Sequence, residues 1–105
     1  MEPTDDGLQT LVKTMKALAN PIRLRIIALL EREPSHAYAI AKELGVSYPL
    51  AHLHLKGLKK MGLIEEIEQE EREGRPSVKT YAPTDFEIVI SSGMIHDVVM
   101  KEEKE

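Results

Sequence analysis

Apolar residues recur every three or four positions over the first third of the chain, which is the period of one face of an α-helix. Thr4 suits the N-cap of a first helix, whose apolar stripe comprises Leu8, Leu11, Val12, Met15, Leu18 and Ala19. Asn20 and Pro21 follow and suit an N-cap and a first-turn position, so they predict the start of a second helix. The stripe of the second helix comprises Ile22, Ile26, Leu29 and Leu30, and residues 33–35 end it.

Two further helices are predicted over residues 36–61, with a short turn between them. Ser35 suits the N-cap of the first, which runs to Leu44, and Gly45 suits its C-terminal end. Ser47 suits the N-cap of the second, which ends at residue 61 and tolerates a proline in its first turn. Two helices joined in this way form a helix-turn-helix.

A β-hairpin is predicted directly after the helix-turn-helix, over residues 63–81. It consists of a strand over residues 63–68, a turn over residues 71–76 and a return strand over residues 77–81. A hairpin in this position is a wing. Thr84 and Glu87 match a capping box, which predicts a last helix over residues 84–100. We expect a mainly α fold with a β-hairpin wing, forming one winged helix-turn-helix domain over residues 1–105.

The last predicted helix is more apolar than one core-facing stripe requires. We expect its additional apolar residues to form a dimer interface with the first helix, because a chain of 105 residues has a small core. The alternative is a helix that is buried on several sides within one chain. The residues assigned to dimerisation are Leu8, Leu11, Phe86, Ile90, Met94 and Val98.

The helix over residues 47–61 separates its side chains into two faces when successive residues are placed 100° apart. The inner face, which we expect to pack on the preceding helices, comprises Ala51, Leu55 and Leu58. The outer face and its flanks comprise Tyr48, Pro49, His52, Leu53, Lys56, Lys59 and Lys60. Hydroxyl and imidazole groups can bond base edges, lysines can bond phosphate or guanine, and a leucine can contact a thymine methyl group. The Ser47 hydroxyl and the positive end of the helix dipole add to these DNA-binding groups.

The distribution of charge along the chain bears on this interpretation. The formal net charge is −4, which argues against indiscriminate binding to phosphates. Residues 47–61 nevertheless contain three lysines and no acid, whereas residues 65–73 contain six glutamates and one arginine. A lysine-rich helix is also common on the solvated surface of proteins, so both interpretations stay open on charge alone.

The sequence contains no cysteine, which excludes disulfides, thiolate metal sites and thiol chemistry. It shows no nucleophile–base pair, phosphate-binding loop or metal-ligand spacing, so we expect no catalytic residues, no metal, no cofactor and no enzyme activity. His52 and His54 point to different sides of a helix, and we expect His54 to pack near the edge of the core. No apolar run is long enough to cross a membrane and no signal peptide is visible, so a cytoplasmic location is expected.

Residues 17–30 (ALANPIRLRIIALL) and 47–63 resemble the arsenic-repressor-like (ArsR/SmtB) winged helix-turn-helix regulators. Residues 74–76 resemble the tip of that family's wing and residues 78–81 its return strand, so the likeness covers residues 11–85. The resemblance implies a homodimeric transcriptional regulator that binds an inverted-repeat operator. It further implies that Arg75 reaches the minor groove or the DNA backbone. It places five helix residues against bases and phosphates: Tyr48, Pro49, His52, Leu53 and Lys56.

The chain departs from the family pattern in two places. Many relatives hold thiophilic metals with paired cysteines on the third helix, which this chain lacks. His96 and Asp97 are neighbours on the last predicted helix, where side chains diverge by 100°, so we expect them not to chelate one ion together. The hairpin is rich in glutamate, which repels phosphate, so wing contacts are expected from Arg72 and Arg75, with Lys79 as a further candidate.

We therefore expect a homodimeric, sequence-specific DNA-binding transcriptional regulator that acts as a repressor. The helix over residues 47–61 would insert into the major groove of an inverted-repeat operator. Its partners would be double-stranded DNA and a second copy of the chain, with no membrane. The sequence leaves open whether any effector controls binding. The alternative is a winged-helix adaptor that binds another protein through the acidic hairpin. The DNA-binding residues are Ser47, Tyr48, Pro49, His52, Leu53, Lys56, Lys60 and Arg75.

Overall fold

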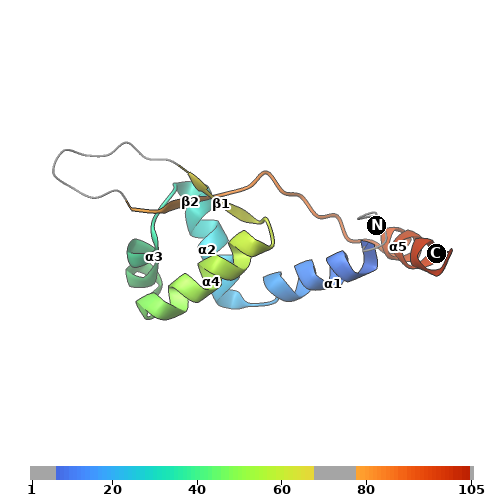
Figure 1. Ribbon diagram of the computed structural model, residues 1–105, viewed down its shortest axis with the longest axis horizontal. Helices are drawn as coiled ribbons and strands as arrows, with labels where there is room; N and C mark the ends of the chain where they lie inside the picture. The colour runs from blue at the N-terminus through green and yellow to red at the C-terminus, as the bar shows by residue number, and fades with distance from the viewer. Residues whose placement is uncertain (1–6, 68–77, 105) are drawn as a thin grey trace. The chain divides into compact units, whose positions relative to one another are not determined.

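The computed structural model describes residues 7–67 and 78–104 of the chain. These residues divide into two compact units: unit 1 lies within residues 1–16 and 87–105, and unit 2 covers residues 17–86. Each unit is described on its own, and the single domain expected over residues 1–105 stays a prediction. The elements in chain order are α1 (Gly7–Leu18), α2 (Pro21–Arg32), α3 (Ala37–Leu44), α4 (Tyr48–Lys60), β1 (Ile64–Ile67), β2 (Thr80–Pro83) and α5 (Ser92–Lys104) (Figure 1).

The expected start of α2 is confirmed by the hydrogen bonds of Asn20. Its Oδ1 atom accepts from the backbone N–H of Ile22 at 2.8 Å and from that of Arg23 at 3.2 Å. These bonds satisfy two of the donors that the first turn of a helix leaves unpaired, and Pro21 has no such donor to satisfy. The helix buries Ile26 and Leu30, which are two of the four residues in its predicted stripe.

The helix-turn-helix consists of α3, the turn over residues 45–47 and α4, as predicted (Figure 1). Gly45 ends α3 with a φ of 69°, a left-handed conformation that favours glycine because a Cβ atom strains it. The Ser47 Oγ atom accepts from the backbone N–H of Leu50 at 3.2 Å and caps α4 as expected.

The N-cap of α3 is His36, so the prediction of Ser35 in this role is wrong. The Nδ1 atom of His36 accepts from the backbone N–H of Ala39 at 3.3 Å. Ser35 instead pairs with Tyr81 of β2: the Ser35 N–H donates to the Tyr81 carbonyl at 3.2 Å and the Tyr81 N–H donates to the Ser35 carbonyl at 2.8 Å. This bridge holds the start of α3 against the hairpin.

The hairpin pairs β1 and β2 antiparallel, with Ile64 opposite Pro83 and Ile67 opposite Thr80. The return strand therefore runs over Thr80–Pro83 and not over residues 77–81 as expected. The predicted turn over residues 71–76, with Arg72 and Arg75, lies outside the described residues. The described part of the wing confirms the predicted fold class, which is mainly helical with one two-stranded hairpin.

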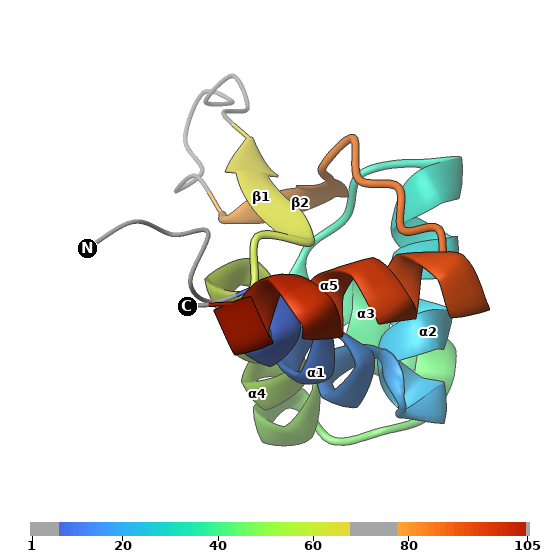
Figure 2. The same cartoon turned by 90° about the vertical axis from the view of Figure 1, so that its right-hand side faces the viewer.

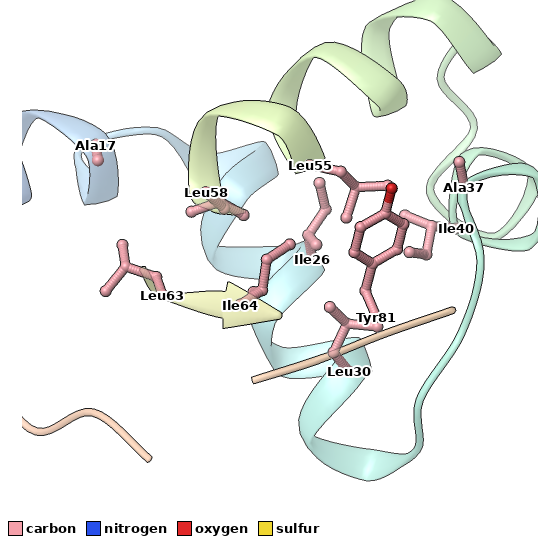
Figure 3. Close-up of a cluster of buried hydrophobic side chains, with 10 residues drawn as sticks. All are labelled: Ala17, Ile26, Leu30, Ala37, Ile40, Leu55, Leu58, Leu63, Ile64 and Tyr81. Carbon is pink, nitrogen blue, oxygen red and sulfur yellow. The ribbon is translucent and has the colours of Figure 1, made fainter. Parts of the chain in front are cut away.

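The core of unit 2 lies between α2, α3, α4 and the hairpin. Figure 3 shows the Tyr81 ring from β2 among Leu30, Ile40 and Leu55, so each of the three helices contributes to the same cluster. Burying each of these aliphatic side chains stabilises the fold by about 1.5–3 kcal/mol relative to leaving it exposed. The large side chains that are fully buried are Ile26, Leu30, Ile40, Leu55, Leu58, Ile64 and Thr80.

The last helix begins at Ser92, so the prediction of a helix that opens at Thr84 is wrong. The Thr84 hydroxyl donates to the Gly62 carbonyl at 2.8 Å, and the Thr84 N–H donates to the Leu63 carbonyl at 3.1 Å. Thr84 thus ties the chain to the segment after α4 and does not cap a helix. The Oγ atom of Ser91 performs that role, since it accepts from the Met94 N–H at 3.1 Å.

Unit 1 contains α5 and most of α1. The start of α1 lies beside α5 in both Figure 1 and Figure 2, and a Cβ atom built on Gly7 would lie 3.8 Å from Cγ1 of Val98. Two dimer-interface residues that were expected on the last helix are not on α5: Ile90 precedes it, and Phe86 packs against the core of unit 2. None of the helices in the described residues has the length and apolar character that a membrane span requires.

Candidate nucleic-acid interface

The two predicted faces of α4 are confirmed by the burial of its side chains. Ala51, Leu55 and Leu58 are 0–1% exposed and anchor the helix in the core. The opposite side is open to solvent, with Tyr48 50% and Leu53 60% exposed. The remaining exposed residues of the predicted site on this helix and its cap are Ser47, Pro49, His52, Lys56 and Lys60.

Tyr48 and His52 lie together at the N-terminal end of the outer face. They are one helical turn apart, and their ring centroids are separated by 5.9 Å at an angle of 54° between the planes. A phenol and an imidazole held side by side place several hydrogen-bonding atoms at the end of α4 where the helix dipole is positive. This arrangement suits contact with base edges and phosphates.

A hollow of about 200 Å³ extends this surface toward α3 and the hairpin. The Ser35–Tyr81 bridge brings the first turn of α3 next to β2, and Tyr48 and His52 of α4 complete the wall. The residues that line the hollow are His36, Ala37, Tyr38, Tyr48, His52, Val78, Lys79 and Tyr81.

Two exposed residues at this hollow were missed by reasoning from the sequence: Tyr38, which is 64% exposed, and Val78, which is 53% exposed. Helical periodicity alone does not distinguish Tyr38 from Ala37 as the inward residue of α3. The structure buries Ala37 and exposes Tyr38, and thus places a second phenol beside the outer face of α4.

The three lysines of α4 are not equivalent. Lys59 forms a salt bridge with Glu66 of β1, and this hydrogen bond raises the pKa of Lys59 and lowers that of Glu66. The Lys79 Nζ atom lies 3.9 Å from the same carboxylate. The Glu66 carboxylate therefore offsets part of the positive charge on this flank, while Lys56 and Lys60 are exposed on the outer face.

His54 lies on the inner half of α4, as expected, and is 8% exposed. Its Nδ1 atom accepts a hydrogen bond from Nε of Arg23 at 3.1 Å. Burial, and then the positive charge of Arg23, lower the pKa of His54 from its ordinary value of 6.5. His54 is consequently a neutral acceptor at neutral pH and not part of the exposed surface.

Across residues 7–67 and 78–104, no three potential ligands converge in a way that could hold a metal ion. His96 and Asp97 are in contact on α5, with Nδ1 of His96 3.3 Å from Oδ1 of Asp97. Both side chains are exposed, at 71% and 85%. Two exposed groups of this kind form a surface contact.

Comparison with known proteins agrees with the fold. The HTH-type transcriptional regulator MJ0229 of Methanocaldococcus jannaschii is 34% identical over 84 residues, which cover 80% of this chain and 86% of that protein. The homodimeric winged helix-turn-helix DNA-binding domain of Mb0332 from Mycobacterium bovis, a possible ArsR-family regulator, is 27% identical. Its match covers 92% of this chain and 79% of that domain, with a TM-score of 0.60.

An ArsR-like transcriptional regulator from Rhodococcus sp. RHA1 has the same fold, with 23% identity and a TM-score of 0.62, over 91% of this chain and 76% of that one. Fold and relatives together define the chain as a winged helix-turn-helix transcriptional regulator, with the ArsR-like architecture that the sequence indicated. The model of the family "Sugar-specific transcriptional regulator TrmB" matches residues 26–87. The chain belongs to this TrmB family, and the match spans α3, α4 and the hairpin.

Proposed function

We propose that the protein is a homodimeric, sequence-specific DNA-binding regulator that acts as a repressor and not as an enzyme. The observation that carries the proposal is the division of α4 into a buried inner face and an exposed outer face. Leu58 is 0% exposed and Leu53 60% exposed on the same helix. A helix anchored in this way presents its outer side chains as a fixed set, which recognition in a major groove requires.

The proposed contacts follow from the chemistry of the exposed groups. Tyr48, His52 and Leu53 would contact base edges, while Lys56 and Lys60 would bind phosphates on either side of the groove. Ser47 and Pro49 would lie at the N-terminal end of α4, where the helix dipole attracts phosphate. The contact of Arg75 with the minor groove or the backbone is part of the same proposal, based on the family resemblance.

The dimer would form through α1 and α5. These helices expose Val12, Met15 and Ile95 at 41%, 44% and 41%, more apolar surface than one isolated side chain would present. The relative from Mycobacterium bovis is described as homodimeric, which supports the same assembly here. A two-fold dimer binds an inverted repeat, with half-sites about 34 Å apart on one side of the duplex. Bound over a promoter, such a dimer blocks the polymerase, which is the basis for repression.

The test is binding to an operator selected from genomic fragments, measured by fluorescence anisotropy at several salt concentrations. Lys56→Ala is expected to weaken binding to all sequences and to reduce the salt dependence by roughly one phosphate contact per protomer. His52→Ala is expected to relax the preference at particular positions. Lys13→Ala is the matched control, because it removes an exposed lysine from α1, outside the proposed contact surface.

Equal effects of Lys56→Ala and Lys13→Ala would show that the outer face of α4 does not bind DNA. A wild-type protein that binds no genomic fragment, but binds another protein through the hairpin, would favour an adaptor instead.

A further inference from the structure

A cluster around Arg23 joins α2, α4 and the end of α1 at Ala17. Arg23 belongs to α2 and is half-buried, and its Nε atom donates to Nδ1 of His54 on α4 at 3.1 Å. Its Nη1 atom lies 3.5 Å from the carbonyl oxygen of Ala17 in the last turn of α1, a long contact. One guanidinium group thus connects α2 to α4 and to the last turn of α1.

Gly57 provides the space in which this guanidinium lies. A Cβ atom built on Gly57 would be 2.6 Å from Nη2 and 3.0 Å from Cζ of Arg23, so the guanidinium lies directly against the backbone of α4. Glycine within a helix is less favourable than alanine by about 1 kcal/mol. The close approach of Arg23 gives a physical reason for a glycine at this position.

His54 accepts the Arg23 hydrogen bond in its neutral form. Arg23 is the charged group that acts on His54 among the described residues, and from α1 the Ala17 carbonyl faces the same guanidinium. Protonation would place a hydrogen on Nδ1, so that two positive donors would face each other. The lowered pKa of His54 agrees with this geometry.

We propose that Arg23, which lies on Gly57 and is bonded to His54, is a positioning residue for DNA binding that fixes α4 relative to α2 and the last turn of α1. The inference rests on the proposed function, since it takes the outer face of α4 as the DNA-binding surface. None of the three residues is on that face: His54 is buried, and Arg23 and Gly57 are half-buried. Their effect on DNA would come from the placement of Lys56, Leu53 and His52.

Gly57→Ala tests the proposal without altering Arg23 or His54. The added methyl group displaces the guanidinium, so that α4 is no longer fixed in place, and we expect operator binding to weaken by roughly tenfold. Alanine favours the helix by about 1 kcal/mol, which offsets part of the loss of the Arg23–His54 hydrogen bond, so the variant should remain folded in the binding assay, as circular dichroism checks. The matched control is Gly93→Ala in α5, where the nearest atom to the new methyl group is Oγ of Ser91 at 4.0 Å, and it should leave affinity unchanged.

His54→Asn adds a readout that a merely structural role would not change. An asparagine oxygen can accept from Arg23 near the position of Nδ1 but does not titrate. Wild-type affinity should fall as the pH drops below the ordinary histidine value of 6.5, because protonation removes the acceptor. The affinity of His54→Asn should match wild type at pH ~7.5 and lack this component of the fall.

The proposal is overturned if Gly57→Ala binds the operator as wild type does, or if His54→Asn and wild type share one pH profile. Lys56→Ala, measured in the same series, separates this failure from failure of the proposed function. If Lys56→Ala weakens binding and Gly57→Ala does not, the DNA-binding surface stands and the positioning role is wrong. If Lys56→Ala has no effect, the surface is wrong and the positioning role is overturned with it.

Discussion

At the scale of single residues, α4 contains side chains that are buried in the core and side chains that are exposed to solvent. Leu58 and Leu53 make the comparison directly, because they are the same residue type on one helix, 0% and 60% exposed. Removing Leu58 from water stabilises the fold by about 1.5–3 kcal/mol, whereas Leu53 leaves most of its apolar surface in water. Burial in the core therefore explains a leucine at position 58. An exposed leucine at position 53 fits the proposed contact with DNA.

Substitution of these two leucines should separate stability from binding. Leu58→Ala should lower the free energy of unfolding by about 2–5 kcal/mol, because it leaves a cavity in the core. Leu53→Ala should change it by less than about 0.5 kcal/mol, yet weaken operator binding. Urea unfolding followed by circular dichroism, together with anisotropy on the operator, measures both effects. Similar destabilisation by the two substitutions would contradict the assignment of the faces.

At the scale of the elements, local signals in the sequence correctly predicted the start of α2, the end of α3 and the start of α4. The Asn20 cap, the left-handed Gly45 and the Ser47 cap each act within four residues, so their chemistry is visible in the sequence. The faces of α4 follow from helical period alone. These features predict the helix-turn-helix, the exposed lysines of α4 and the residues by which α4 packs in the core.

The features that were missed depend on residues far apart in the chain. From the sequence, Ser35 and Thr84 both suit the N-cap of a helix. In the structure, the Ser35 backbone pairs with Tyr81 and the Thr84 hydroxyl bonds to the Gly62 carbonyl. Both residues have a competing partner that no local pattern reveals. The hollow beside Tyr38 and the Arg23–His54 contact were not foreseen for the same reason.

The helix α5 supports a prediction about assembly. Ile95 is 41% exposed, so Ile95→Glu should cost little in the monomer but place a charge in an apolar dimer interface. We expect sedimentation velocity to show a shift from dimer to monomer, with a parallel loss of operator affinity. His96→Glu, next to it in sequence and also exposed, serves as the control and should remain dimeric. A dimer that survives Ile95→Glu would exclude this face of α5 from the interface.

At the scale of the whole molecule, the proposed function requires this acidic protein to bind DNA, which is a polyanion. The net charge is −4, so affinity for DNA has to come from lysines that are gathered on one surface. Lys59 is paired with Glu66, so the proposed phosphate contacts of α4 come from Lys56 and Lys60, which are exposed on its outer face. Few phosphate contacts per protomer mean weak non-specific binding, so two half-sites read by two copies of α4 would supply both affinity and sequence preference.

Site-directed cleavage of the operator tests most directly whether α4 lies in the major groove. Because the chain has no cysteine, Leu53→Cys provides a single attachment point for a probe that cleaves nearby DNA, and Leu24→Cys on α2 provides a control of similar exposure, 52% against 60%. The account predicts two clusters of cleavage from position 53, one in each half-site about 34 Å apart, and none from position 24. Cleavage from position 24 alone, or the same pattern from both positions, would contradict it.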